Sequence, residues 1–273
     1  MSRRRRPRWR VRTVLPLLLG LALLIWIMLP LVPVLLWSAA GAWRAPDVLP
    51  SSWTADAALS LAEPEVLMAG VRSLGLGLSV AVTATVLGGL AAFGLRGPTP
   101  GGSPASTRLI GFVMLTPLAV PPFALVMGSN VLLLGARAPS FLGVLIVLTV
   151  TALPYTTYMF VTALASYEDR FEAVARTLGA SPAQVVLKVR LGLLMPAIAR
   201  AGFLAFLVGW SDYITTVLIG GGQFITLPLL LGSAASSTGG EQLTAALSLA
   251  MIVPPVVLLI LLARRGARGR TSS

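Results

Sequence analysis

The sequence contains no cysteine and no histidine, and only nine of its 273 residues are acidic. Without cysteine, the chain has no disulfide, no thiolate metal site and no thiol nucleophile. Without histidine, it can build neither a Ser-His-Asp triad nor a histidine-ligated zinc site. No paired carboxylates are placed for acid-base chemistry. These absences argue against an enzyme, and we expect no catalytic residue and no bound metal.

A nucleotide-binding loop is also missing. The pattern Gly-x-x-x-x-Gly-Lys-Ser/Thr does not occur, and Lys188 is the only lysine of the chain. A P-loop needs its lysine to reach the outer phosphates of the nucleotide. We therefore expect no cofactor in this chain.

Charged residues make up only 11% of the sequence, whereas 56% of the residues are hydrophobic. A soluble domain of this composition would leave apolar surface in water, so the chain belongs in a bilayer. A spanning helix needs about 20 mostly apolar residues. Runs of about this length cover residues 14–37, 73–95, 109–134, 141–165, 199–219 and 243–263.

The sequence therefore predicts an all-α integral membrane protein with six transmembrane helices. Its membrane domain covers residues 14–263, between a basic N-terminus at 1–13 and a basic tail at 264–273. A cleaved signal peptide is the alternative for the first run. That run, however, is longer than the roughly 7 to 15 apolar residues of such a peptide.

The net charge is +12, and the basic residues are concentrated in the N-terminus, the C-terminal tail and alternate predicted loops. Of the 21 basic residues, only Arg44, Arg72 and Arg137 lie in segments assigned to the outer face. Basic loops stay on the cytoplasmic side, which places both termini inside and requires an even number of spans. The basic residues form no stripe interleaved with aromatics, so we expect the lipid bilayer as a partner and no nucleic acid.

The longest inner loop, residues 166–198, is predicted to hold two short helices separated by a sharp bend. The first begins near Asp169 and ends at Gly179, where a left-handed turn is easiest for glycine. Glu172 is expected either to cap this helix or to accept a hydrogen bond or salt bridge. Ser181 and Gln184 then form a capping box that begins the second helix.

An apolar face is predicted on the first of these helices, made by Phe171, Val174, Ala175 and Leu178. The loop has no domain of its own to cover this face, so a groove on another protein is expected to receive it. The alternative is that the helix lies in the lipid headgroup region.

These residues resemble a known family. Glu172-Ala-Val, Gly179 seven positions later, Val189-x-Leu191 and Pro196 are similar to the EAA loop of type I ATP-binding-cassette importer permeases. In that family the loop is a coupling helix that docks on a cytoplasmic ATPase. The resemblance implies the same contact here for Arg170, Phe171, Glu172, Ala173, Val174, Arg176, Leu178 and Gly179. Two departures are Val174, where alanine is usual, and Gly192, where proline is frequent.

The resemblance extends over most of the chain. The segments Leu49-Pro-Ser-Ser-Trp53, Trp210-Ser-Asp-Tyr213 and Thr226-Leu-Pro228 are similar to permeases of polyamine, ferric-iron and thiamine importers. It implies a bacterial inner-membrane protein that pairs with a second permease, either a copy or a related chain. It also implies two ATP-binding subunits and an extracytoplasmic solute-binding protein as partners. The sequence does not name the solute.

A solute pathway is expected along the prolines and the one carboxylate inside the predicted spans. Asp212 falls in the fifth run beside Trp210, and Pro121 and Pro122 fall in the third. An intramembrane carboxylate is costly and needs a partner, so it either faces a pathway or bonds to a neighbouring helix. Two other functions stay open, an ion-coupled carrier and a membrane anchor without a path. A carrier normally has ionisable groups in several spans.

Overall fold

The computed structural model describes residues 9–44, 46–96, 111–112, 114–117 and 119–270. The described chain is almost entirely helical, which confirms the all-α membrane fold class. Two compact units can be distinguished. The first comprises Met1–Ala62 with Ala234–Ala250, and the second comprises Glu63–Ser233 with Met251–Ser273.

The first unit contains the first predicted span as two helices, α1 (Trp9–Met28) and α2 (Leu31–Ser38), which meet at an angle of 43°. Pro30 lies at the break, where a proline removes a backbone donor. After α2, strand β1 (Ala40–Ala42) pairs antiparallel with β2 (Ser52–Trp53), and α3 (Asp56–Ser60) follows. The Gln242 side chain donates to the Gly41 carbonyl at 3.2 Å and ties this hairpin to the start of α13 (Glu241–Arg270).

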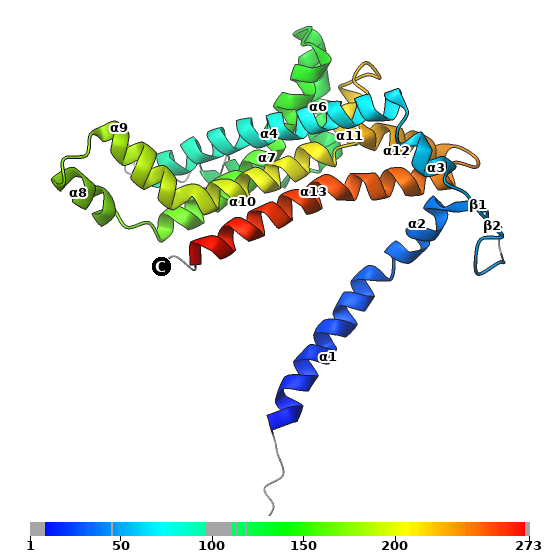
Figure 1. Cartoon of the computed structure of the whole chain (residues 1–273). Helices are drawn as coiled ribbons and strands as arrows, with labels where there is room; N and C mark the ends of the chain where they lie inside the picture. Colours follow the sequence, from blue (N-terminus) through cyan, green and yellow to red (C-terminus); the bar gives the residue numbers. More distant parts are fainter. Residues whose placement is uncertain (1–8, 45, 97–110, 113, 118, 271–273) are drawn as a thin grey trace, which may run out of the picture. The chain divides into compact units, whose positions relative to one another are not determined.

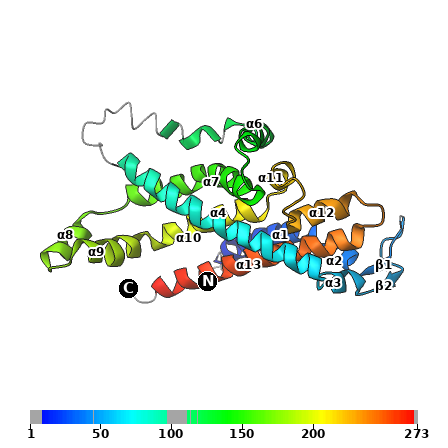
Figure 2. The ribbon, with the colours of Figure 1, turned by 90° about the horizontal axis from the view of Figure 1, so that it is seen from above.

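The second unit is built on three long helices that pack against one another, α4 (Pro64–Arg96), α7 (Ser140–Ala165) and α10 (Leu191–Trp210) (Figures 1 and 2). Glycine allows the close approach of α4 and α10, because a Cβ on Gly209 would lie 2.9 Å from the Gly77 Cα. Around this crossing lies a core of Leu76, Val80, Ala84, Val144, Leu148, Ala152 and Ala205.

Hydroxyl groups join α4 to α7 within this core. The Thr83 and Thr149 hydroxyls lie 2.9 Å apart, and the Thr156 hydroxyl donates to the Ala84 carbonyl at 2.9 Å. In hydrocarbon a buried polar group needs such a partner, so these bonds fix the register of the two helices.

Four described helices are long and apolar enough to cross a membrane, and the bent pair α1 and α2 makes up to five. The third predicted span is described only in part, because residues 109–110, 113 and 118 lie outside the described residues. Its second half is α6 (Pro122–Gly135), 14 residues long. The six-span count therefore stays a prediction. The short apolar segment after residue 226 is α12 (Leu227–Ser236), ten residues long.

The predicted bounds of the fifth span are wrong. Instead of residues 199–219, one continuous helical stretch extends from Pro182 to Trp210 and contains Pro196. The helix begins earlier because the residues from Leu191 onward are as apolar as those of the predicted span, so they continue the helix rather than end it. The bounds of the inner loop, 166–198, stay a prediction.

Within the second unit, α8 (Arg170–Thr177) lies beyond the end at which α4 and α13 finish, whereas α11 (Ile214–Leu218) lies toward the other end (Figures 1 and 2). The bend after α8 and the last turns of α13 therefore lie toward the same end of the helices, in agreement with the charge pattern (Figures 1 and 2).

Candidate functional site

The predicted bend after α8 is present. Gly179 has a φ of +84°, in the left-handed region that favours glycine. Its N–H donates to the Arg176 carbonyl at 3.0 Å, and the next N–H, of Ala180, donates to the Ala175 carbonyl at 3.0 Å. This pair of bonds is a Schellman motif, which satisfies the last carbonyls of the helix and turns the chain away.

The second helix begins at once, as predicted. The Gln184 N–H donates to the Ser181 hydroxyl at 3.3 Å, and the Ser181 N–H donates to the Gln184 side-chain oxygen at 2.9 Å. This capping box starts α9 (Pro182–Gln184), with proline at the first position. A π-helical segment, η1 (Val185–Arg190), then leads directly into α10.

The apolar face of α8 is exposed, as the sequence predicts. The exposed fractions are 46% for Phe171, 56% for Val174 and 82% for Leu178. Ala175 is half-buried. Three further predicted contact residues, Arg170, Ala173 and Arg176, are also exposed. The cap at Ser181 and the turn at Gly179 thus hold an open apolar surface in a defined direction.

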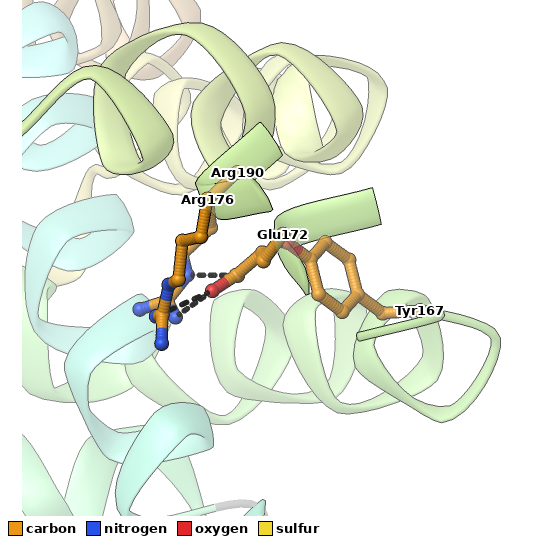
Figure 3. Close-up of polar contacts among 4 residues, drawn as sticks. All are labelled: Tyr167, Glu172, Arg176 and Arg190. Carbon is orange, nitrogen blue, oxygen red and sulfur yellow. Dashed lines mark hydrogen bonds and ion pairs between the residues drawn. The ribbon is translucent and has the colours of Figure 1, made fainter. Parts of the chain in front are cut away.

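Glu172 is the exception on this helix, because only 6% of it is exposed. Its carboxylate accepts hydrogen bonds from the Tyr167 hydroxyl at 2.5 Å and from Arg190 Nε at 2.8 Å and Nη2 at 2.9 Å (Figure 3). Arg176 Nη2 lies farther away, at 3.5 Å. We refer to Tyr167, Glu172 and Arg190 as the Glu172 clasp.

Of the two roles expected for Glu172, a helix cap or an acceptor of a hydrogen bond or salt bridge, the structure shows the second. The Asp169 side chain makes no capping hydrogen bond at the start of α8. The bend brings Arg190, eighteen residues further along the chain, beside Glu172, and a bidentate guanidinium is a stronger partner than a backbone N–H. The sequence gives no signal for Tyr167 and Arg190, because no periodic spacing connects them to Glu172.

The clasp keeps its carboxylate charged. The hydrogen bonds from Arg190 lower the pKa of Glu172 from its ordinary value of 4.5 to about 2, and they outweigh the burial that acts in the opposite direction. Burial raises the pKa of Tyr167, and so does its hydrogen bond to the Glu172 carboxylate. At neutral pH the clasp is therefore a buried ion pair with a neutral tyrosine.

Asp212 lies two residues past the end of α10, and its place inside the membrane stays a prediction. One carboxylate oxygen accepts from the Thr215 N–H at 3.3 Å, and the other accepts from the Thr216 N–H at 2.9 Å and the Thr216 hydroxyl at 3.0 Å. Asp212 thus caps the short helix α11. The bond is to its own chain segment, and not to a neighbouring span.

Asp212 also lines a cavity of about 440 Å³ in the second unit. Pro122 lines the same cavity, so two of the predicted pathway residues meet although they are far apart in sequence. The full lining is Pro122, Val126, Leu148, Thr151, Val208, Ser211, Asp212, Tyr213, Ile214 and Thr215.

The other two predicted pathway residues lie elsewhere. Trp210 is 3% exposed, stacks on Phe206 and donates its indole N–H to the Met251 carbonyl at 2.9 Å. It packs in the core and does not line the cavity. Pro121 precedes α6 with extended backbone, and Pro122 is the first residue of α6, so this pair lies at a break between the helical residues 114–117 and α6.

Comparison with known proteins identifies the family. The family model described as binding-protein-dependent transport system inner membrane component matches residues 84–268. The chain belongs to this family. It is therefore a multi-pass inner-membrane component of a transport system, and the family is not one of enzymes. The predicted resemblance to importer permeases is confirmed.

Among curated relatives, the chain is 28% identical over 171 residues to the spermidine/putrescine transport system permease protein PotC of Haemophilus influenzae, covering 62% of this chain and 64% of that protein. It is also 28% identical over 168 residues to PotC of Escherichia coli, covering 62% of each. The chain thus spans less than two thirds of the length of these relatives.

Two solved structures share the fold. A chain of a bacterial ABC transporter involved in the import of the acidic polysaccharide alginate aligns with a TM-score of 0.70 at 17% identity, covering 96% of this chain and 99% of that one. A chain of the MetNI methionine ABC transporter in an inward-facing conformation aligns with a TM-score of 0.57 at 17% identity, covering 74% and 96%. At these identities the likeness concerns the fold.

Proposed function

We propose that the chain forms half of the translocation pathway of an ATP-driven importer. A solute-binding protein outside the membrane delivers the solute, a second permease completes the pathway, and separate ATPase subunits bind and hydrolyse ATP. The observation that carries the proposal is the exposed apolar face of Phe171, Val174 and Leu178, held by the turn at Gly179 and the cap at Ser181.

The ATPase contact is proposed for α8 because burying its exposed apolar face in a partner would stabilise the complex. Each large apolar side chain that becomes fully buried contributes about 1.5 to 3 kcal/mol. The face is part of the loop that the charge pattern assigns to the cytoplasm, where an ATPase would bind.

For the solute we propose a small cation of the polyamine type. The cavity has a single carboxylate, Asp212, beside the hydroxyl groups of Thr151, Ser211 and Tyr213. A carboxylate in an otherwise neutral cavity favours a cationic ligand. The two PotC relatives belong to spermidine/putrescine transport systems, which points to the same solute class.

A charge placed on the exposed face tests the ATPase contact. In Leu178→Asp the permease should still insert, because Leu178 is 82% exposed and supports no core. The ATPase encoded with the permease should no longer co-purify, since a buried unpaired charge is costly at an interface. The matched control is Thr177→Asp, which adds the same charge one residue earlier, outside the predicted contact set.

Two other outcomes would contradict the proposed contact between α8 and the ATPase. If the ATPase co-purifies equally with both variants, α8 is not its docking helix. If Leu178→Asp instead only weakens attachment of α8 to the headgroup region, the purified complex stays intact and the proposal fails.

A further inference from the structure

Arg190 lies at the junction between the bend and the long helix α10. It is the last residue of η1, and the helix continues from Leu191 without a break. The main packing partner of α8 among the described elements is η1. Whatever holds α8 in place must therefore act close to this junction.

On one side, the Arg190 guanidinium donates two hydrogen bonds to Glu172 of α8. Its Nε and Nη2 meet the two Glu172 oxygens at 2.8 and 2.9 Å, in the parallel two-bond geometry that a guanidinium forms with a carboxylate (Figure 3). Glu172 is buried, so this pair is poorly screened. Arg176 reaches the same carboxylate at 3.5 Å from a side chain that is 64% exposed, which makes it the weaker partner.

On its other side, the guanidinium lies over the ring of Phe93, 5.4 Å from the ring centre. This is within the distance of a cation–π contact. Phe93 belongs to α4 and packs on the core cluster at the inner end of the helices, which consists of Ala92, Phe160, Leu164, Leu194, Ala197 and Ala201. Arg190 therefore joins α8, α10 and α4 at one point.

We propose that Arg190 is the positioning residue that makes α8 and the inner end of α4 move as one body. The inference rests on the proposed ATPase contact of α8 for its functional meaning. Without Arg190, α8 would keep its exposed face, its caps and the hydrogen bond from Tyr167 to Glu172, but it would lose its link to Phe93 of α4. Motion imposed on α8 would then be absorbed in the loop rather than passed to α4.

Because the chain has no cysteine, spin labels attach only to cysteines that are introduced for a distance measurement. Spin labels on Thr177→Cys in α8 and Leu90→Cys in α4 report the α8–α4 distance in the purified permease and in its complex with the ATPase. For the otherwise unchanged chain we expect one narrow distribution that is the same in the ADP-bound and vanadate-trapped complexes. Adding Arg190→Gln should broaden it by about twofold, as for a segment that opens locally, and make it depend on the nucleotide.

Two further variants separate positioning from general damage. Arg176→Gln should leave the distribution narrow, because Arg176 is the weaker partner of Glu172. Arg190→Lys should give a narrower distribution than Arg190→Gln, since the ammonium can still pair with Glu172 and contact the Phe93 ring. A merely structural defect at Arg190 would not depend on whether the positive charge is kept.

The proposal is overturned if the distribution is broad without Arg190→Gln, if Arg190→Gln leaves it unchanged, or if Arg190→Lys is as broad as Arg190→Gln. Co-purification of the ATPase is measured in the same samples. Its absence from the labelled wild-type permease would contradict the proposed function. The distance change in the permease alone would still decide the role of Arg190.

Discussion

Asp212 combines two roles at the scale of the single residue, since it caps α11 and lines the 440 Å³ cavity. Asparagine keeps one acceptor oxygen for the Thr216 N–H, so Asp212→Asn should lose the charge and only the longer bond from the Thr215 N–H at 3.3 Å. We expect uptake of labelled spermidine by the reconstituted importer to fall about tenfold, as for a lost charged contact of about 1.4 kcal/mol. Assembly with the ATPase should be unchanged.

The matched control is Asp47→Asn, which removes an exposed carboxylate outside the cavity. Spermidine uptake by this variant should equal that of the wild type. Unchanged uptake and solute preference in Asp212→Asn, with assembly intact, would remove Asp212 from the pathway.

Glu172 gives a prediction with a defined pH dependence. Because its pKa is lowered from 4.5 to about 2, the clasp stabilises the folded state fully above pH 4.5 and is lost as pH falls toward 2. At pH 7, Glu172→Gln should lower the melting temperature by about 3 to 8 °C, since hydrogen bonds to charged groups contribute about 1.5 to 3 kcal/mol. The difference in melting temperature between the wild type and Glu172→Gln should decrease steadily between pH 4.5 and 2.

The control for this titration is Glu168→Gln, which removes an exposed ion pair with Arg170. Exposed pairs contribute little, so its melting temperature should follow that of the wild type. If the melting-temperature difference between the wild type and Glu172→Gln stays constant or grows on acidification, the Glu172 clasp does not stabilise the folded state.

At the scale of the element, the direction of α8 depends on Gly179. A side chain in the left-handed region costs about 1 to 2 kcal/mol, and a β-branched one costs more. We therefore expect Gly179→Val to leave the permease inserted but to reduce ATPase co-purification and solute uptake together. The bend would be altered while the membrane helices stay intact.

Gly192→Val is the matched control, because a Cβ at either glycine meets nothing within 4 Å and only Gly179 has positive φ. Gly192→Val should therefore behave as the wild type. Wild-type co-purification and uptake in Gly179→Val would mean that the bend does not direct the coupling helix.

At the scale of the whole molecule, the charge pattern predicts that both termini are cytoplasmic. Reporter fusions after Gly102 and after Ser273 should read as cytoplasmic, whereas a fusion after Gly239 should read as external. The position of α8 at the end where α4 and α13 finish agrees with this assignment (Figure 2). A C-terminus found outside the cell would contradict the six-span topology.

The sequence by itself determined the membrane class, the helices and the bend. Composition alone requires a bilayer, and the bend depends on contacts between residues at most five positions apart, such as Ser181 with Gln184. Local rules for caps and glycine turns cover contacts of this kind. The exposed face of α8 follows equally from helical periodicity and the lack of a covering domain.

Only the tertiary structure decided which distant residues meet. Arg190 reaches Glu172 across the bend, Pro122 joins Asp212 at one cavity, and Trp210 enters the core instead of the pathway. The bounds of α10 also needed the structure, because apolar residues continue a helix equally well in lipid or against protein. Local propensity and periodicity describe one element at a time, whereas these contacts depend on how packed helices cross.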